Sequence, residues 1–121
     1  MAERPLILVV DDDGPILILM RNLLREFGFE PIAAANGPQA IEEARRRTPD
    51  LILLDRNMPG MNGDEVLRVM RSDGTLASVP VLMLTGEPMD PAEVKRLGAT
   101  AAVMKPFDVP ALVERIRAHL D

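Results

Sequence analysis

Residues 51–60 read LILLDRNMPG: four aliphatic residues lead into Asp55, and Met58, Pro59 and Gly60 follow shortly after it. A continuous apolar run of this length is typical of a strand that is buried on both faces at the centre of a parallel sheet. The proline and glycine predict a turn after it. Asp55 is therefore expected at the carboxyl end of a central strand, where open α/β sheets bind their ligands. An isolated aspartate can also simply end a strand, so the interpretation depends on the other strand ends.

An apolar run followed by an amphipathic segment occurs five times along the chain. Strands separated by helical crossovers become parallel, with right-handed connections and helices on both faces of the sheet. The pattern predicts an α/β fold with a doubly wound, five-stranded parallel sheet. The expected apolar positions of the first helix include Leu19, Met20 and Leu24. The strands are expected at residues 6–10, 31–35, 51–55, 79–84 and 101–104, and the helices at residues 16–27, 39–47, 62–72, 90–97 and 107–120.

The composition limits the classes of function. The chain has 121 residues, the size of one domain, and no cysteine, which excludes disulfides, thiolate metal sites and a cysteine nucleophile. Its formal charge of −5 argues against non-specific nucleic-acid binding. Arg45, Arg46 and Arg47 are better explained by the dipole of the helix that they end.

The chain also lacks the sequence features of exported and membrane proteins. Its first apolar run is too short for a signal peptide, and no segment is long enough to span a membrane. We therefore expect one cytoplasmic domain over residues 1–121, with no effector domain, no direct nucleic-acid partner and no membrane contact. Whether such a chain acts alone or belongs to a longer protein stays open.

Polar residues follow four of the five expected strands. Asp11 and Asp12 follow the first, Asp55 ends the third, Thr85 follows the fourth, and Lys105 follows the fifth. Because the carboxyl ends of parallel strands meet at one edge of the sheet, these side chains are expected to converge.

The types of these residues indicate phosphoryl transfer. Carboxylates that lie close together repel unless one is protonated or a cation lies among them. Oxygen ligands without histidine or cysteine favour Mg²⁺ or Ca²⁺, and no calcium-binding loop is present. Lys105 supplies a point charge suited to a phosphate, and Thr85 supplies a hydroxyl donor. The set predicts a phosphoryl-transfer site with an aspartate nucleophile.

Five short motifs lie at the expected strand ends and in the turns that follow them: Val9-Val10-Asp11-Asp12, Leu53-Leu54-Asp55, Met58-Pro59-Gly60 with Gly63, Leu84-Thr85-Gly86 and Lys105-Pro106-Phe107. Through these motifs the chain, from about residue 5 to its end, resembles a response-regulator receiver domain of two-component signalling. The resemblance implies the flavodoxin-like sheet order 2-1-3-4-5. It also implies a phosphorylation-switched protein whose partners are a sensor histidine kinase or phosphotransfer protein and a downstream protein target.

The resemblance also implies the roles of individual residues around the metal. Asp55 would accept the phosphoryl group. Asp12 and Asp55 would ligate Mg²⁺ directly, Asp11 would do so through water, and the backbone carbonyl of Asn57 would complete the protein ligands. Lys105 would pair first with Asp55 and then with the phosphoryl group.

Further roles concern switching and the lifetime of the phosphoryl group. By the resemblance, Thr85 would hold a phosphoryl oxygen, and Gly86 would leave room for it. Ala102 stands where many relatives have an aromatic residue. We therefore expect the conformational change caused by phosphorylation to pass through the backbone and the loop after Thr85. Asn57 and Glu87 follow strand ends beside the site, so we expect them to orient the water that removes the phosphoryl group.

Two alternatives remain beside a signalling module that catalyses only its own phosphorylation and dephosphorylation. The first is a degenerate receiver that binds a partner without phosphorylation. The second is a metal-dependent phosphatase with an aspartyl nucleophile. Such phosphatases place a second acid two residues after the nucleophile, whereas this chain has Asn57 there.

Overall fold

The computed structural model describes residues 3–120, which form five strands and five helices in strict alternation. Residues 1, 2 and 121 of the expected domain lie outside the described residues. The strands are β1 (Leu6–Val10), β2 (Glu30–Ala34), β3 (Leu51–Asp55), β4 (Val81–Thr85) and β5 (Ala101–Met104). The helices are α1 (Gly14–Glu26), α2 (Gly37–Arg46), α3 (Gly63–Ser72), α4 (Pro91–Leu97) and α5 (Val109–Ala118).

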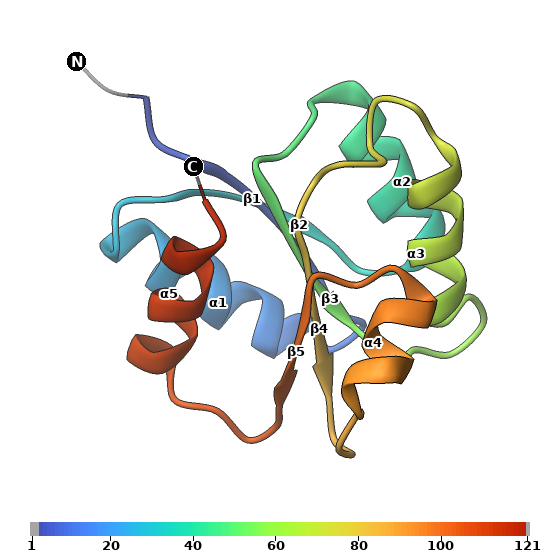
Figure 1. Ribbon diagram of the computed structural model, residues 1–121. Coiled ribbons are helices and arrows are strands. Elements are labelled where there is room, and N and C mark those ends of the chain that lie inside the picture. Colours follow the sequence, from blue (N-terminus) through green and yellow to red (C-terminus); the bar gives the residue numbers. More distant parts are fainter. Residues whose placement is uncertain (1–2, 121) are drawn as a thin grey trace.

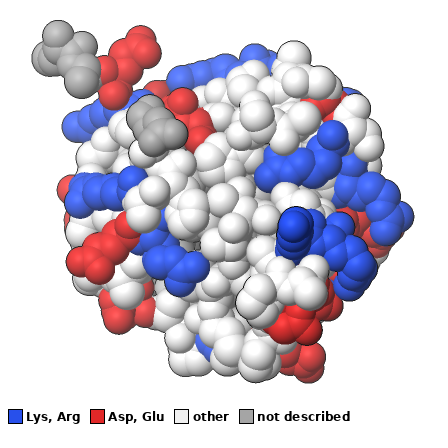
Figure 2. Space-filling view, in the orientation of Figure 1, with Lys and Arg blue, Asp and Glu red and all other residues white. Residues whose placement is uncertain are grey.

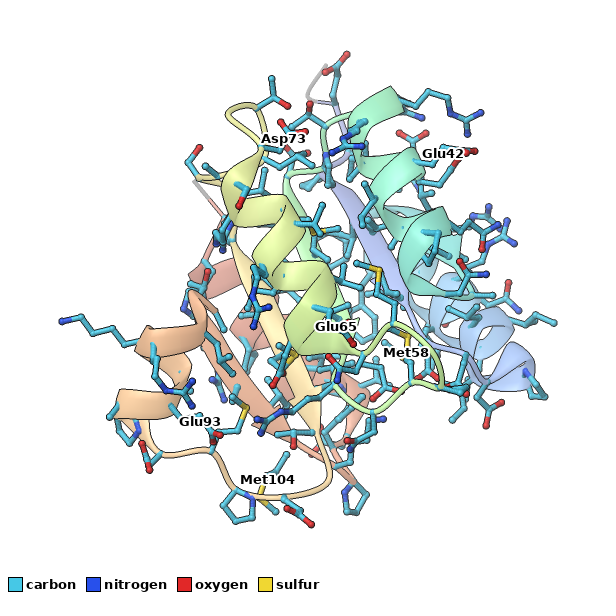
Figure 3. The ribbon with its side chains drawn as sticks, turned by 90° about the vertical axis from the view of Figure 1, so that its right-hand side faces the viewer. Glu42, Met58, Glu65, Asp73, Glu93 and Met104 are labelled. Atoms are coloured by element: carbon cyan, nitrogen blue, oxygen red, sulfur yellow. The ribbon has the colours of Figure 1, made fainter. Side chains whose placement is uncertain are left out.

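The strands form one parallel sheet in the order β2-β1-β3-β4-β5, as expected. Helices α1 and α5 cover one face, and α2, α3 and α4 cover the other (Figure 1). Glu93 and Met104 lie toward one end of the molecule, and Glu42 and Asp73 lie toward the opposite end (Figure 3). Because Met104 ends β5, the first of these ends carries the carboxyl termini of the strands.

The core consists of two apolar layers, one on each face of the sheet. Successive strand residues point to opposite faces, so Ile7 and Val9 belong to one layer, and Leu8 and Val10 belong to the other. All residues of β1, β3 and β4 are buried, whereas the edge strands β2 and β5 are partly exposed. The continuous apolar runs therefore became the three central strands.

Two strands differ from their expected bounds. Strand β2 begins at Glu30 rather than at residue 31 because the Glu30 amide donates to the carbonyl of Pro5 and pairs the strand with β1. Strand β4 begins at Val81 because Val79 still belongs to a turn. It extends to Thr85, which pairs with the last residue of β5.

Side-chain caps set where the helices begin. The side chains of Asp13, Asn36, Asn62, Asp90 and Asp108 each accept a hydrogen bond from the backbone N–H three residues later. The expected start of the last helix at residue 107 is therefore wrong, because Asp108 caps the helix from outside it. The expected starts at residues 16 and 39 are also wrong, because the caps at Asp13 and Asn36 start these helices at residues 14 and 37.

Helix α1 is apolar over more of its circumference than one core can cover. Leu17, Met20 and Leu24 are buried against the sheet. The expected inward position of Leu19 is wrong, because this side chain is 55% exposed. Ile18 beside it is 61% exposed. The helix therefore presents aliphatic side chains to solvent.

The start of α3 rests directly on the backbone that carries Asp55. The Gly63 amide donates to the carbonyl of Arg56, with a distance of 3.0 Å between nitrogen and oxygen. A Cβ atom at Gly63 would lie 2.6 Å from the carbonyl oxygen of Asp55 and 2.7 Å from the Cα of Arg56. Only glycine allows this approach.

We predict that Gly63→Ala lowers the free energy of unfolding by about 1–3 kcal/mol, because the added methyl group meets rigid backbone. Gly74→Ala is the matched control, since a Cβ at Gly74 has no atom within 4 Å. The chain has no Trp or Tyr, so denaturation is followed by far-ultraviolet circular dichroism. Equal stability of the two variants would contradict the prediction, because it would show that α3 can move away from β3 without lowering the free energy of unfolding.

Candidate functional site

Three carboxylates gather at the carboxyl ends of the neighbouring strands β1 and β3. Asp11, Asp12 and Asp55 each place an oxygen within 4.8 Å of the others. Asp11 and Asp55 are buried, with 5% and 3% of their surface exposed, and Asp12 is exposed. The structure therefore brings together the three acids that the sequence placed at strand ends.

Lys105 reaches the same site from β5, on the far side of β4. Its Nζ lies 2.8 Å from Oδ1 of Asp55. The backbone N–H of Asn57 donates to the same oxygen over 3.3 Å. Within residues 3–120, Oδ2 of Asp55 accepts no hydrogen bond. The two oxygens of this carboxylate therefore differ, and Oδ2 is the one left for a ligand or a reaction.

The site carries more negative than positive charge. Burial raises the pKa of Asp11, and the charges of Asp55 and Asp12 raise it further. The backbone N–H of Asp13, 2.9 Å from Oδ1 of Asp11, and the ammonium group of Lys105 act in the opposite direction. Three carboxylates against one ammonium leave a formal charge of −2 when all are ionised.

The donor set fits Mg²⁺. All three clustered side chains offer carboxylate oxygens, two of them buried at the edge of the sheet, and no histidine or cysteine takes part. Magnesium is bound in proteins through one or two carboxylates together with waters and phosphate oxygens. A divalent cation would also relieve the repulsion that raises the pKa of Asp11.

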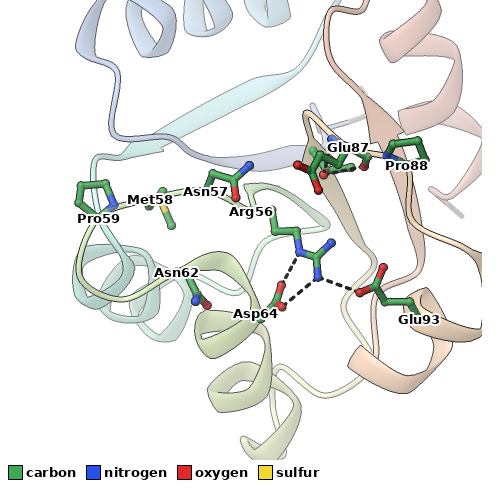
Figure 4. Close-up of a pocket in the computed structure, with 10 residues that line it drawn as sticks. Arg56, Asn57, Met58, Pro59, Asn62, Asp64, Glu87, Pro88 and Glu93 are labelled. Atoms are coloured by element: carbon green, nitrogen blue, oxygen red, sulfur yellow. Dashed lines mark hydrogen bonds and ion pairs between the residues drawn. The ribbon is translucent and has the colours of Figure 1, made fainter.

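Thr85 lies at the end of β4, with 1% of its surface exposed. Its hydroxyl donates to the carbonyl of Glu87 over 2.9 Å and accepts from the Glu87 amide over 3.2 Å. The hydroxyl is therefore held by the loop that follows its own strand. Thr85, Glu87 and Asn57 line one open pocket of about 750 Å³ beside Asp55 (Figure 4).

Arg56 is a residue of this pocket that the sequence analysis missed. Its guanidinium donates to both carboxylate oxygens of Asp64, over 3.0 and 3.2 Å, and to Glu93 over 3.0 Å (Figure 4). These bonds raise the pKa of Arg56, first through Asp64 and then through Glu93. The sequence does contain a pattern that could have predicted these ion pairs. An arginine directly follows the central aspartate, and each of the next two helices has an acidic residue in its first turn.

Ala102 lies in β5 opposite Met83 of β4. Together with Met89, Val94 and Ala101 it lines a groove of about 440 Å³ between β5 and α4. Small side chains on β5 thus leave this space open. A Cβ at Gly86, in the loop before α4, would meet no atom within 4 Å.

The basic residues at the end of α2 form ion pairs on the surface. Arg45 pairs with Asp73 over 3.0 Å, and Arg47 pairs with Glu30 over 3.1 Å. Within residues 3–120, no helix combines the length and the apolar character that crossing a bilayer requires.

The chain is similar to a known family of protein domains over most of its length. The family described as "Response regulator receiver domain" matches residues 7–117. The chain belongs to this family. Receiver domains are signalling domains of two-component systems rather than classical enzymes, and phosphorylation on an aspartate is characteristic of them. They interact with histidine kinases or phosphotransfer proteins, and their chemistry generally depends on magnesium.

Individual relatives differ in length. The DNA-binding response regulator MtrA of Mycobacterium tuberculosis is 42% identical over 119 residues, covering 97% of this chain and 51% of MtrA. The chain thus spans about half the length of the MtrA relatives that it matches. Sporulation initiation phosphotransferase F of Bacillus subtilis is 36% identical, covering 94% of this chain and 92% of that protein.

Solved structures agree with the fold. The chemotaxis protein CheY4 of Vibrio cholerae superposes with a TM-score of 0.90 at 33% identity, covering 97% of this chain and 99% of that chain. The predicted family and the predicted order of the strands are both confirmed.

We predict that Asp12→Asn stabilises the metal-free protein by about 1 kcal/mol, because it removes one charge from the repelling cluster. Asp13→Asn is the matched control: Asp13 caps α1, and asparagine caps a helix equally well. Thermal unfolding in chelator measures both variants. Added Mg²⁺ should reduce the difference between Asp12→Asn and the parent, because bound metal stabilises the parent more. A melting temperature of Asp12→Asn at or below that of the parent in chelator would contradict the repulsion.

Proposed function

We propose that the chain is a phosphorylation-switched receiver that accepts a phosphoryl group onto Asp55 from a phosphohistidine of a sensor kinase or phosphotransfer protein. The observation that carries the proposal is the environment of Asp55. Its carboxylate is buried, Lys105 occupies one oxygen, and two further acids lie beside it. This arrangement suits a nucleophile that must meet both a cation and a phosphate.

We propose that Asp12 and Asp55 hold Mg²⁺ directly, Asp11 through water, and Asn57 through its backbone carbonyl. When bound there, Mg²⁺ offsets the charge of the carboxylate and phosphoryl oxygens that must approach each other. The three clustered carboxylates support this assignment. The single positive charge of Lys105 is not enough to offset the negative charge of both the carboxylate and the phosphoryl group.

In the proposed transfer, Oδ2 of Asp55 forms a bond to phosphorus. The phosphorus–nitrogen bond of the phosphohistidine breaks, and the imidazole leaves with the bonding electron pair. Lys105 begins beside Oδ1, 2.8 Å away, where it holds the carboxylate in place, and then pairs with the phosphoryl group. The hydroxyl of Thr85 then exchanges the carbonyl of Glu87 for a phosphoryl oxygen.

An apolar surface beside the site supports transfer from a protein donor. Ile16, Ile18 and Leu19 are exposed in the first turns of α1, which begins directly after the β1 acids. Met104, directly before Lys105, is exposed as well. Aliphatic patches next to a reactive group are typical of surfaces that bind another protein.

The output of the switch is proposed to be a protein–protein contact. Figure 2 shows a band of uncharged atoms between basic side chains on the face formed by α4, β5 and α5. Because Ala102 has no side-chain rotamer, we propose that the change reaches this face through the loop after Thr85 rather than through β5. We propose a cytoplasmic receiver domain with no direct nucleic-acid contact and no membrane contact, which agrees with the absence of cysteine and the net acidic charge.

The two alternatives are less well supported. A metal-dependent phosphatase with an aspartyl nucleophile places an acid two residues after that nucleophile, and the amide of Asn57 is not a general acid. A receiver that works without phosphorylation has no need of the buried Asp55–Lys105 pair or of the acids around it.

We predict that labelling by a small-molecule phosphodonor requires both Mg²⁺ and Asp55. Asp55→Asn should accept no phosphoryl group. Lys105→Ala should lose most of the labelling, because the carboxylate and phosphate then meet without a fixed cation. Lys95→Ala is the matched control, since Lys95 is the only other lysine and lies on the exposed surface of α4.

A base-labile adduct that depends on Asp55 supports the receiver. Turnover of the donor without an adduct would favour the phosphatase, and normal labelling of Asp55→Asn would remove this residue as the acceptor. A folded, magnesium-binding chain that neither accumulates an adduct nor turns over donor would favour the degenerate receiver.

We predict that Asn57→Met combined with Glu87→Leu slows loss of the phosphoryl group several-fold without preventing its gain. Both residues line the open pocket beside Thr85, where polar side chains can hold and orient water. The decay of labelled protein after removal of the donor gives the rate. The pair Asn22→Met and Glu26→Leu on the exposed face of α1 is the control. Equal decay in both double variants would remove Asn57 and Glu87 from the mechanism.

A further inference from the structure

Helix α4 is the helix of the described chain that is least embedded in the core. It has seven residues, Pro91–Leu97, and none of them is buried. Each of the other four helices buries at least three residues. A helix without buried residues depends on its ends for attachment, and such elements are the first to open in a folded protein.

The carboxyl end of α4 is fastened by Arg71 of α3. Its Nε donates to the carbonyl of Gly98, the residue that ends α4, over 2.8 Å. Its Nη1 donates to the carbonyls of Leu76 and Val79 over 3.1 and 2.8 Å. Because this guanidinium is bound to several fixed carbonyls at once, the carboxyl end of α4 is a fixed pivot.

The amino end of α4 is held by one ion pair to a neighbouring element. Nη2 of Arg56 lies 3.0 Å from Oε2 of Glu93, and both side chains are less than a third exposed. Arg56 itself is anchored: its amide donates to Leu84, its carbonyl accepts from Gly63, and Asp64 binds its guanidinium through both oxygens. Arg56 therefore cannot follow α4 if the helix moves.

The same end of α4 is connected to the phosphoryl site. Arg56 directly follows Asp55, and the loop from Thr85 leads to Asp90, whose side chain caps α4 by accepting from the amide of Glu93 over 2.8 Å. The hydroxyl of Thr85 now holds the carbonyl of Glu87 within that loop. A phosphoryl group that takes over the hydroxyl frees the loop. Among residues 3–120, the Arg56–Glu93 pair is then the polar contact that still joins the amino end of α4 to another element.

We propose that the Arg56–Glu93 ion pair is a latch that holds α4 in its resting position, with Arg71 as the pivot, and that opening this latch favours the phosphorylated state. The coupling between the latch and the phosphorylated state rests on the proposed function. A ligand shifts a two-state equilibrium only through its different affinity for the two states. A weaker latch therefore reduces the free energy that the phosphoryl group must supply to move α4.

The first experiment measures amide hydrogen exchange over residues 90–98 in the unphosphorylated protein. Glu93→Gln should speed exchange about fivefold, the scale expected for one partly exposed ion pair. Glu93 also lies in the first turn of α4, where a negative charge favours the helix by itself. The decisive comparison is therefore Glu93→Gln in the Arg56→Gln background, where a latch predicts little further effect.

Two control variants separate the latch from general charge effects. Arg96→Gln removes only the longer pair within the helix, 3.8 Å from Glu93, and Glu114→Gln makes the same chemical change on the exposed surface of α5. Both should leave exchange over residues 90–98 within a factor of about two of the parent. Equal effects of Glu93→Gln in the presence and absence of Arg56 would overturn the latch.

The second experiment measures binding of beryllium trifluoride, a phosphoryl mimic, in the presence of Mg²⁺. Glu93→Gln and Arg56→Gln should each tighten binding about two- to fivefold, and the double variant should add little to either. Unchanged affinity with faster exchange would overturn the coupling while leaving the proposed function standing. No binding by the parent chain, with exchange behaving as expected, would instead count against the proposed function and against the coupling that rests on it.

Discussion

Three carboxylates repel one another at the ends of two neighbouring strands, and the charge of the proposed site depends on this repulsion. Asp11, Asp12 and Asp55 converge because β1 and β3 are parallel and adjacent. The strands that carry them are held there by burial of every residue in β1, β3 and β4. Hydrophobic burial therefore fixes the positions of charges that would otherwise separate. Lys105 offsets part of the repulsion, and the remaining negative charge suits this edge to a cation and to the phosphate chemistry that we propose for it.

The consequences of this arrangement extend beyond the site through short connections. Gly63 lets α3 rest on the backbone of Asp55, and Arg56, the next residue, reaches both α3 and α4. The phosphorylation that we propose at Asp55 would therefore change the charge directly beside the contact that holds the least embedded helix of the described chain. Burial decreases from the central strands to α4, and a switch needs such a difference, because the element that moves must be weakly attached.

Much of the fold could be predicted because the central strands are apolar on both faces and the acids follow them directly. Leu19 was misplaced because α1 is aliphatic around most of its surface, so its sequence does not single out one stripe as buried. Arg56 was missed because its partners lie 8 and 37 residues away, and only the packing of α3 and α4 brings them together. Local patterns thus predicted that the acids and Lys105 converge at one edge of the sheet, whereas the contacts that connect this edge to α4 required the tertiary structure.

The most direct test of the account is to locate the phosphoryl group among the three clustered acids. After incubation with a phosphodonor and Mg²⁺, reduction with borohydride converts an acyl phosphate to the corresponding alcohol, and mass spectrometry of peptides then identifies the modified residue. The account predicts modification at Asp55, because it alone combines burial, the Lys105 contact and an oxygen free of hydrogen bonds within residues 3–120. Modification at Asp11 or Asp12, or on a side chain outside the cluster, would contradict it.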